Sequence, residues 1–206
     1  MSISFKGLLF IGPHPDDVEM GCGGTISKYC RCADIIYLIL SPCLDDARNK
    51  AILDEARNAI AHLGLSTENM IIENLSRRTF HEQRREIRDI LISVRDKYKP
   101  DMVFCPSLND IHQDHSVAAE ETLRLFRDIG VIAYENPRSS IHFEPTLYVQ
   151  LSDKNVENKV KGLMCYKSQY DRYYFKPKII QSFALMRGSQ IGVEYAEAFE
   201  VLRMKA

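Results

Sequence analysis

Two short segments of the sequence concentrate histidine and aspartate in a way that could bind a metal ion. The first is PHPDDVE, residues 13–19, and the second is NDIHQDH, residues 109–115. Imidazole and carboxylate groups are ligands of catalytic zinc, which has three protein ligands and one open position. The sequence therefore predicts a catalytic metal site to which both segments contribute.

The first segment offers His14 and one of two neighbouring carboxylates, Asp16 or Asp17, as ligands. A strand places alternate side chains on opposite faces, and prolines disfavour a helix, so we expect the two aspartates to point in different directions. One could bind the metal while the other faces its open side. The second segment offers His112 or His115, whose rings can share one side of a helix start. Incidental histidines among capping aspartates are the alternative, which the repetition of the pattern disfavours.

Each segment directly follows an apolar run, and such runs alternate with amphipathic stretches. The apolar runs predict strands at residues 7–11, 34–40, 70–73, 102–105, 131–134 and 146–151. The amphipathic stretches predict helices that include residues 24–32, 45–63, 80–98, 114–129, 153–165 and 192–204. This alternation predicts an α/β fold, a Rossmann-like and mostly parallel sheet with helices on both faces. Ligands of such folds bind beyond the carboxyl ends of the strands, where we expect the metal site.

The composition predicts one globular domain over residues 1–206, with 45% apolar and 27% charged residues. A net charge of -1 gives no electrostatic reason to expect a nucleic acid or an anionic membrane as a partner. No apolar run is long enough to span a bilayer and no signal sequence is evident, so we expect a cytoplasmic protein without a membrane segment. The six scattered cysteines are expected to be free thiols.

Several other features allow two interpretations. Arg77 and Arg78 could bind a phosphate group or belong to an ordinary loop, and residues 134–138 could line a sugar pocket or form a turn. Aromatic residues between 166 and 175 could stack on a sugar, although core or interface packing is favoured. The GCGG run at residues 21–24 lacks the spacing of phosphate-binding loops, which favours close helix packing.

The two segments together resemble the signature of an enzyme family. PHPDDVE with GCGGT, residues 21–25, is similar to the (A/P)HPDDE…GCGG signature of the PIG-L/LmbE-like zinc-dependent deacetylases, and HQDH, residues 112–115, looks like their HPDH motif. The RG pair at residues 187–188 and YAEAF at residues 195–199 are similar to the C-terminal pattern. The resemblance implies a hydrolase that removes an N-acetyl group from an N-acetylglucosamine-type sugar or conjugate, releasing acetate and a free amine.

The resemblance also implies which residues bind the metal. His14, Asp17 and His115 would be the ligands, and the metal would be Zn2+, with another divalent transition metal as the alternative. Asp16 would then be the general base that takes a proton from the attacking water. The residues by themselves leave open which of the two neighbouring aspartates has which role.

Further roles follow from the same resemblance. His112, in its protonated form, would stabilise the developing oxyanion, and Asp114 would be the carboxylate that orients His112. Arg48 is the nearest candidate for a substrate-binding arginine, and Asp110 stands where some relatives have a tyrosine. Together with Arg138, these two residues are the predicted substrate contacts.

The expected partner is a small amino-sugar substrate. The family often assembles into trimers or hexamers, so the resemblance leaves room for a homo-oligomer. Two other functions remain open from the sequence. One is a zinc hydrolase that cleaves a different amide or an ester on the same scaffold, and the other is a noncatalytic sugar-binding protein. The second would usually have lost a ligand or the base, and this sequence has lost neither.

Overall fold

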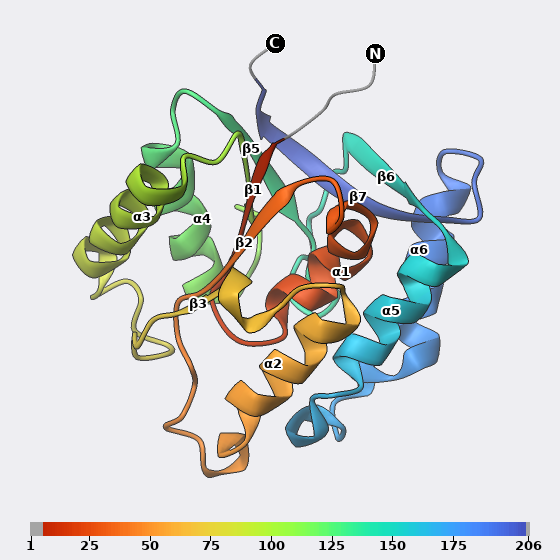
Figure 1. Ribbon diagram of the computed structural model, residues 1–206, viewed down its shortest axis with the longest axis horizontal. Coiled ribbons are helices and arrows are strands. Elements are labelled where there is room, and N and C mark those ends of the chain that lie inside the picture. Colours follow the sequence, from red (N-terminus) through yellow and green to blue (C-terminus); the bar gives the residue numbers. More distant parts are fainter. Residues whose placement is uncertain (1–5, 205–206) are drawn as a thin grey trace.

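A seven-stranded sheet runs through the molecule and carries helices on both faces (Figure 1). It is described here from a computed structural model that covers residues 6–204. The strands are β1 (Gly7–Gly12), β2 (Asp34–Ile39), β3 (Met70–Ile72), β4 (Met102–Pro106), β5 (Gly130–Tyr134), β6 (Leu147–Leu151) and β7 (Tyr195–Arg203). Their order across the sheet is β3-β2-β1-β4-β5-β7-β6. Neighbours from β3 to β5 are parallel, and β7 is antiparallel to both β5 and β6. The prediction of a mostly parallel α/β sheet is confirmed.

The helices form two layers, one on each face of the sheet (Figure 1). One layer contains α3 (Arg84–Tyr98) and α4 (Gln113–Leu125), and the other contains α1 (Asp17–Tyr29), α2 (Ile52–His62), α5 (Asp153–Leu163) and α6 (Pro177–Ser189). Short 3-10 helices occupy Ala47–Asn49, Thr67–Asn69, Lys167–Gln169 and Tyr173–Phe175.

Strand β1 shows how the sequence places the sheet between these layers. Leu8 and Phe10 belong to the apolar cluster on the α1 side, whereas Leu9 and Ile11 belong to the cluster on the α3 side. All four side chains are buried. A strand that is covered on both faces must be apolar at successive positions, so the continuous apolar run at residues 7–11 correctly predicted β1.

The order of the strands reverses direction at β1. The chain moves from β1 outward through β2 to β3 and then returns through α3 to β4 on the other side of β1. The strands β1 and β4 are neighbours, and the chain leaves their carboxyl ends in opposite directions. A crevice therefore opens between these two strands at the carboxyl edge of the sheet. Both histidine-containing segments follow these two strands.

The C-terminal region differs from the prediction. The helix expected at residues 192–204 is wrong, because Tyr195–Arg203 forms strand β7 between β5 and β6. Glu197 and Glu200 are three residues apart, which resembles helical spacing, but both are buried and paired within the fold. Glu197 accepts a hydrogen bond from Lys159 Nζ (2.7 Å), and Glu200 accepts one from Ser107 Oγ (2.7 Å).

Helix α6 was not predicted, although Pro177 stands at its first position, where proline favours a helix start. Other helices exist as predicted but have different ends. The helix that includes residues 24–29 already begins at Asp17, because only residues 13–16 after β1 remain non-helical. Helices α2 and α3 begin at Ile52 and Arg84, later than expected. All six cysteines are free thiols, as expected.

The GCGG run lies inside α1 and lets this helix approach the sheet closely. A Cβ atom on Gly21 would overlap the ring of Tyr134 on β5, and one on Gly24 would overlap the side chain of Leu151 on β6. The run therefore serves helix packing, which is the interpretation that its spacing favoured over a phosphate-binding loop.

We expect Gly21→Ala to lower the free energy of unfolding by about 1–3 kcal/mol, because overlap with a buried aromatic ring outweighs the helix propensity gained with alanine. Urea unfolding followed by circular dichroism measures the change. Gly23→Ala is the matched control, since a Cβ there meets the flexible Lys159 side chain at 3.0 Å and should cost less. A Gly21→Ala protein as stable as the parent would contradict this packing.

Candidate metal centre

The loop after β1 turns sharply at Asp16. This residue has left-handed backbone angles, with φ of 89° and ψ of -26°, and α1 begins at the next residue. Aspartate tolerates this conformation better than most residues. Asp16 and Asp17 have different partners, as expected, but the cause is this turn and not the alternation of a strand. Asp17 faces the histidines, while Asp16 Oδ2 lies 3.8 Å from Arg172 Nη1.

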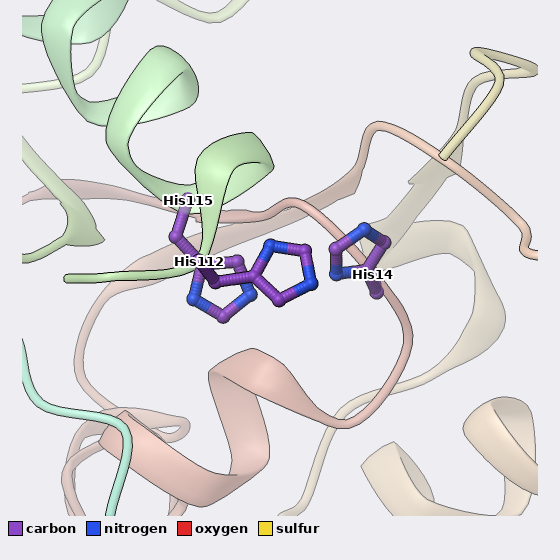
Figure 2. Close-up of side chains that lie close together, drawn as sticks. All are labelled: His14, His112 and His115. Atoms are coloured by element: carbon purple, nitrogen blue, oxygen red, sulfur yellow. The ribbon is translucent and has the colours of Figure 1, made fainter. Parts of the chain in front are cut away.

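Three imidazole rings meet at the crevice between β1 and β4. Figure 2 shows His14 from the β1 loop beside His112 and His115 from the start of α4. The centre of the His14 ring lies 5.0 Å from that of His112 and 5.5 Å from that of His115. One nitrogen from each ring falls within a group of atoms no more than 4.8 Å apart, close enough to hold a metal ion. The two predicted segments therefore converge.

Asp17 lies between two of these rings. Its Oδ2 is 3.1 Å from His14 Nδ1 and 3.2 Å from His115 Nε2. Ligand atoms about 2.0–2.1 Å from a tetrahedral zinc ion are about 3.3 Å apart, so both distances fit a shared metal. His115 Nε2 is buried, and although Asp17 Oδ2 lies 3.2 Å away, the two atoms are not aligned as a hydrogen bond. Within residues 6–204 this nitrogen therefore has no hydrogen-bond partner, and an ion at this position would supply one. His14, Asp17 and His115 thus fit the metal that the sequence predicts.

A second carboxylate holds the far side of each of these two histidines. His115 Nδ1 lies 2.9 Å from Asp110 Oδ2, and His14 Nε2 lies 3.0 Å from Asp114 Oδ2. Carboxylates in this position fix the ring orientation and leave the opposite nitrogen free to bind metal. His115 can therefore bind through Nε2, and His14 through Nδ1.

These contacts correct two sequence-based expectations. Asp114 was expected to orient His112, but its carboxylate contacts His14, and only its backbone N–H donates to His112 Nδ1 (3.2 Å). Asp110 was expected to contact substrate, but it is buried behind His115 and accepts further hydrogen bonds from Ser139 Oγ and the backbone of His112. The geometry of the loop decides which groups Asp110 and Asp114 contact, and the spacing of residues along the chain does not reveal this geometry.

Arg48 also lies elsewhere than expected. Its side chain is 62% exposed and forms an ion pair with Asp46 (2.9 Å), and it is not among the residues that line the pocket at the metal centre. The prediction of a substrate contact for Arg48 is therefore not supported. Arg77 and Arg78, which follow β3, line the pocket in its place.

His112 differs from the other two histidines in its hydrogen bonding. Its Nδ1 accepts from the backbone of Asp114, so a neutral ring carries its hydrogen on Nε2. Burial and the neighbouring His115 lower the pKa of His112 to about 4. The ring is therefore neutral at neutral pH and presents one N–H donor, in contrast to the protonated His112 that the resemblance led us to expect.

The pKa values of the two neighbouring aspartates are shifted in opposite directions. Burial and the adjacent charge of Asp17 raise the pKa of Asp16 well above its usual range. Burial also acts to raise the pKa of Asp17, but the facing His115 and His14 outweigh it and hold that pKa far below the usual value. Carboxyl groups whose pKa values are moved apart in this way can take separate acid–base roles.

A pocket of about 370 Å3 opens over the metal centre. Five of the predicted catalytic and metal-binding residues and Arg138 line it, together with Asn136 and Tyr174, which belong to stretches that the sequence marked as possible sugar contacts. Apart from Arg77 and Arg78, the other lining residues were not connected with a substrate: Pro15, Cys43, Asn49, Ile52, Ile111, Ser139, Gln169 and Arg172.

Two groups among these additional residues matter most. Asn136 Nδ2 donates to Asp17 Oδ1 (2.9 Å), and it lies in the segment after β5 that the sequence marked as a sugar-pocket candidate. Within the aromatic cluster, Tyr166 and Phe175 pack in the core as favoured, but Tyr174 faces the pocket. No pattern identified Arg172, which stands alone among aromatic residues.

The sequence matches the family model for GlcNAc-PI de-N-acetylases, named PIG-L, over residues 9–126. The chain belongs to this family. Its members are metal-dependent deacetylases, so the chain is a hydrolase, and its histidine cluster could hold a metal ion. No helix within residues 6–204 combines the length and apolar character needed to cross a membrane.

Three similar proteins illustrate the extent of the likeness. The uncharacterized deacetylase YaiS of Escherichia coli K12 is 26% identical over 175 residues, which cover 79% of this chain and 91% of that protein. Diacetylchitobiose deacetylase of Thermococcus kodakarensis is 27% identical, over 93% of this chain and 81% of that protein. The structure of N,N'-diacetylchitobiose deacetylase from Pyrococcus horikoshii, at 24% identity, covers 96% of this chain and 84% of its own with a TM-score of 0.78.

Asp110→Asn should weaken metal binding about 10- to 100-fold, because the amide no longer holds the His115 ring as a carboxylate does. Competition with a chromophoric chelator measures the affinity for Zn2+ and for Co2+. Asp54→Asn, at an exposed position on α2, is the matched control and should leave both affinities unchanged. Parental affinity in Asp110→Asn would show that this hydrogen bond does not support the metal.

Asp114→Asn tests the corrected partner of Asp114. We expect a loss of metal affinity of about 10- to 100-fold, because the carboxylate contacts His14 on the side away from the metal. The same chelator competition, combined with turnover of fully metal-loaded protein, distinguishes support of the ligand His14 from orientation of His112. Unchanged affinity with reduced turnover would show instead that Asp114 acts through His112.

Proposed function

We propose that this chain is a zinc-dependent deacetylase that removes the N-acetyl group from an N-acetylglucosamine-type sugar or conjugate, releasing acetate and a free amine. The observation that carries the proposal is the triangle of His14 Nδ1, Asp17 Oδ2 and His115 Nε2 beside a pocket of about 370 Å3. Pockets of this size accommodate small molecules such as a sugar. The relatives named as diacetylchitobiose deacetylases act on an acetylated amino sugar, which agrees with this substrate class.

The donor set favours zinc as the metal. Two imidazoles and one carboxylate, with the fourth position open to the pocket, are typical of catalytic zinc. When bound, such an ion polarises a carbonyl oxygen and lowers the pKa of water. His14, Asp17 and His115 would hold it, while Asp110, Asp114 and Asn136 keep these ligands in place.

Asp16 is suited to be the general base. It lines the pocket next to Asp17 but is not needed as a ligand, and its raised pKa favours uptake of a proton. Asp16 would take a proton from the water that attacks the amide carbon. It would return that proton to the nitrogen as the C–N bond breaks, which releases the free amine. The second hydrogen of the water stays on the acyl group as acetic acid, which then ionises to acetate.

His112 would stabilise the negative charge that develops on the amide oxygen. A neutral His112 ring has its N–H on Nε2, because Nδ1 accepts from the backbone of Asp114. A fixed N–H donor in a partly buried site stabilises an oxyanion without needing a positive charge. The low pKa of His112 agrees with this role as a neutral donor.

The remaining polar groups of the pocket would bind the sugar. Asn49, Gln169 and Arg138 line its wall, and Gln169 Nε2 donates to Asn49 Oδ1 (3.1 Å), which fixes the orientation of both amides. Tyr174 adds an aromatic surface on which a sugar ring can pack. These groups come from three different loops, which explains why the sequence did not identify them as one site.

Asp16→Asn should reduce turnover about 100- to 10,000-fold while the bound metal is retained, because the amide cannot accept the proton. Release of the free amine from N-acetylglucosamine conjugates measures turnover, and atomic absorption measures the metal. Asp89→Asn, at an exposed position on α3, is the matched control. An Asp16→Asn protein with more than a tenth of parental turnover would contradict the assignment.

Assays with phosphomonoesters and simple carboxylic esters distinguish the proposed deacetylase from other hydrolases. The zinc-loaded protein should release amine from N-acetylated sugars far faster than it cleaves either type of ester. Faster ester cleavage would favour a different zinc hydrolase on the same scaffold. Zinc binding without any turnover would favour a noncatalytic sugar-binding protein.

A further inference from the structure

The RG pair at residues 187–188 lies at the end of α6, and neither residue lines the pocket at the metal centre. Gly188 lets this end of α6 lie directly against the turn before β7, because a Cβ atom there would overlap the carbonyl oxygen of Glu194. The backbone N–H of Val193 donates to the Gly188 carbonyl oxygen (3.0 Å), which closes the same turn. Close backbone packing therefore fixes the position from which the Arg187 side chain starts.

Arg187 forms a bidentate ion pair with Glu135, the first residue after β5. Its Nε donates to Glu135 Oε1 (2.8 Å), and its Nη2 donates to Glu135 Oε2 (2.6 Å). Both side chains are largely buried, with exposed fractions of 11% and 12%. Two parallel hydrogen bonds hold a carboxylate in a defined orientation as well as at a defined distance. Helix α6 thus fixes the start of the loop after β5.

The two residues at the start of this loop point to opposite sides of the chain. Glu135 lines a small cavity of about 20 Å3 beside α6, whereas Asn136 lines the pocket over the metal centre. On that side Asn136 Nδ2 donates to Asp17 Oδ1 (2.9 Å). The backbone between the two residues therefore cannot move far without loosening one of these two contacts.

The far end of the same loop is fixed by other groups. Ser139 Oγ donates to Asp110 Oδ2 (2.9 Å), and the backbone N–H of Ile111 donates to the Ser139 carbonyl oxygen (3.0 Å). The Asn136 carbonyl oxygen accepts from the backbone N–H of Ser140 (2.9 Å), which closes the turn between the two ends. The ion pair with Arg187 adds a fixed point at the near end, so Asn136 stays within hydrogen-bond distance of Asp17.

We propose that Arg187 is a positioning residue of the metal centre, which acts through Glu135 and Asn136 on the ligand Asp17. This inference rests on the proposed metal site and does not depend on which substrate is bound. An amide that holds one oxygen of a ligating carboxylate orients the other oxygen toward the metal. The affinity of the site therefore depends on α6, which carries none of the three predicted ligands.

Arg187→Gln should weaken Zn2+ binding about three- to tenfold, less than a change at a residue that contacts a ligand directly, because Arg187 acts through Glu135 and Asn136. Competition with a chromophoric chelator measures the affinity, and the visible absorption of the Co2+-loaded protein should change with the ligand geometry. Arg84→Gln is the matched control, because it removes an ion pair with the buried Glu121 (2.8 Å) and should leave affinity and absorption unchanged. Parental affinity in Arg187→Gln would overturn the proposal.

A double-mutant cycle tests the path from Arg187 to the metal. Asn136→Ala should weaken Zn2+ binding about 10- to 100-fold, because Asp17 loses a direct hydrogen bond. In the Asn136→Ala protein, Arg187→Gln should change the affinity by less than about twofold, since the contact that Arg187 supports is already gone. Equal losses in the presence and absence of Asn136 would show that Arg187 does not act through this residue, which overturns the proposal.

A second variant keeps the test decisive if Arg187→Gln does not fold, as judged by circular dichroism. Glu135→Gln then replaces it in the cycle, because this change keeps the shape of the side chain and removes the charge with which Arg187 is paired. The same losses of affinity are expected, with the same dependence on Asn136.

The affinity measurements also separate this inference from the proposed function. A parent protein that binds Zn2+ and deacetylates an N-acetylated sugar, with unchanged affinity in Arg187→Gln, overturns only the role of Arg187. A parent protein that binds Zn2+ without turnover overturns the deacetylase function, and the cycle still decides the role of Arg187. A parent protein that binds neither Zn2+ nor Co2+ overturns both.

Discussion

The carboxylate of Asp17 holds the loops of the carboxyl edge together. Its Oδ1 accepts a hydrogen bond from Asn136, after β5, and its Oδ2 lies beside His14, after β1, and His115, after β4. Three loops that are far apart in the sequence therefore meet at one buried charged group. A buried carboxylate is costly unless every oxygen has partners, so these contacts fix the three loops relative to one another. The metal centre and the pocket wall both depend on this arrangement.

The sequence predicted that the two histidine-containing segments converge, because their position follows from topology. Parallel strands end at the same edge, so the histidines after β1 and β4 were expected to meet, and His14 and His115 do. Identifying their supporting carboxylates required the loop geometry. Asp110 and Asp114 lie in the same short segment as His115, yet Asp114 contacts the histidine that is 100 residues away. Spacing along the chain favoured a local partner, and the fold provides a distant one.

The C-terminal third was predicted less well, for a related physical reason. Strand β7 carries glutamates whose partners, Lys159 and Ser107, lie in other parts of the fold, so local sequence suggested a helix with a polar face. Likewise, Arg172 and Tyr174 come to the pocket from a loop with no metal-binding or catalytic pattern. The single-domain extent over 1–206, a trimeric or hexameric assembly and the cytoplasmic location stay predictions.

The left-handed backbone at Asp16 restricts what natural variation can do at this position. Glycine, asparagine and aspartate adopt such angles at low cost, whereas β-branched side chains are strained there. Of the three tolerated residues, only aspartate can exchange a proton. A substitution at Asp16 therefore either strains the turn or removes the group that can exchange a proton. We infer that new specificities on this fold arise in the surrounding loops and leave Asp16 unchanged.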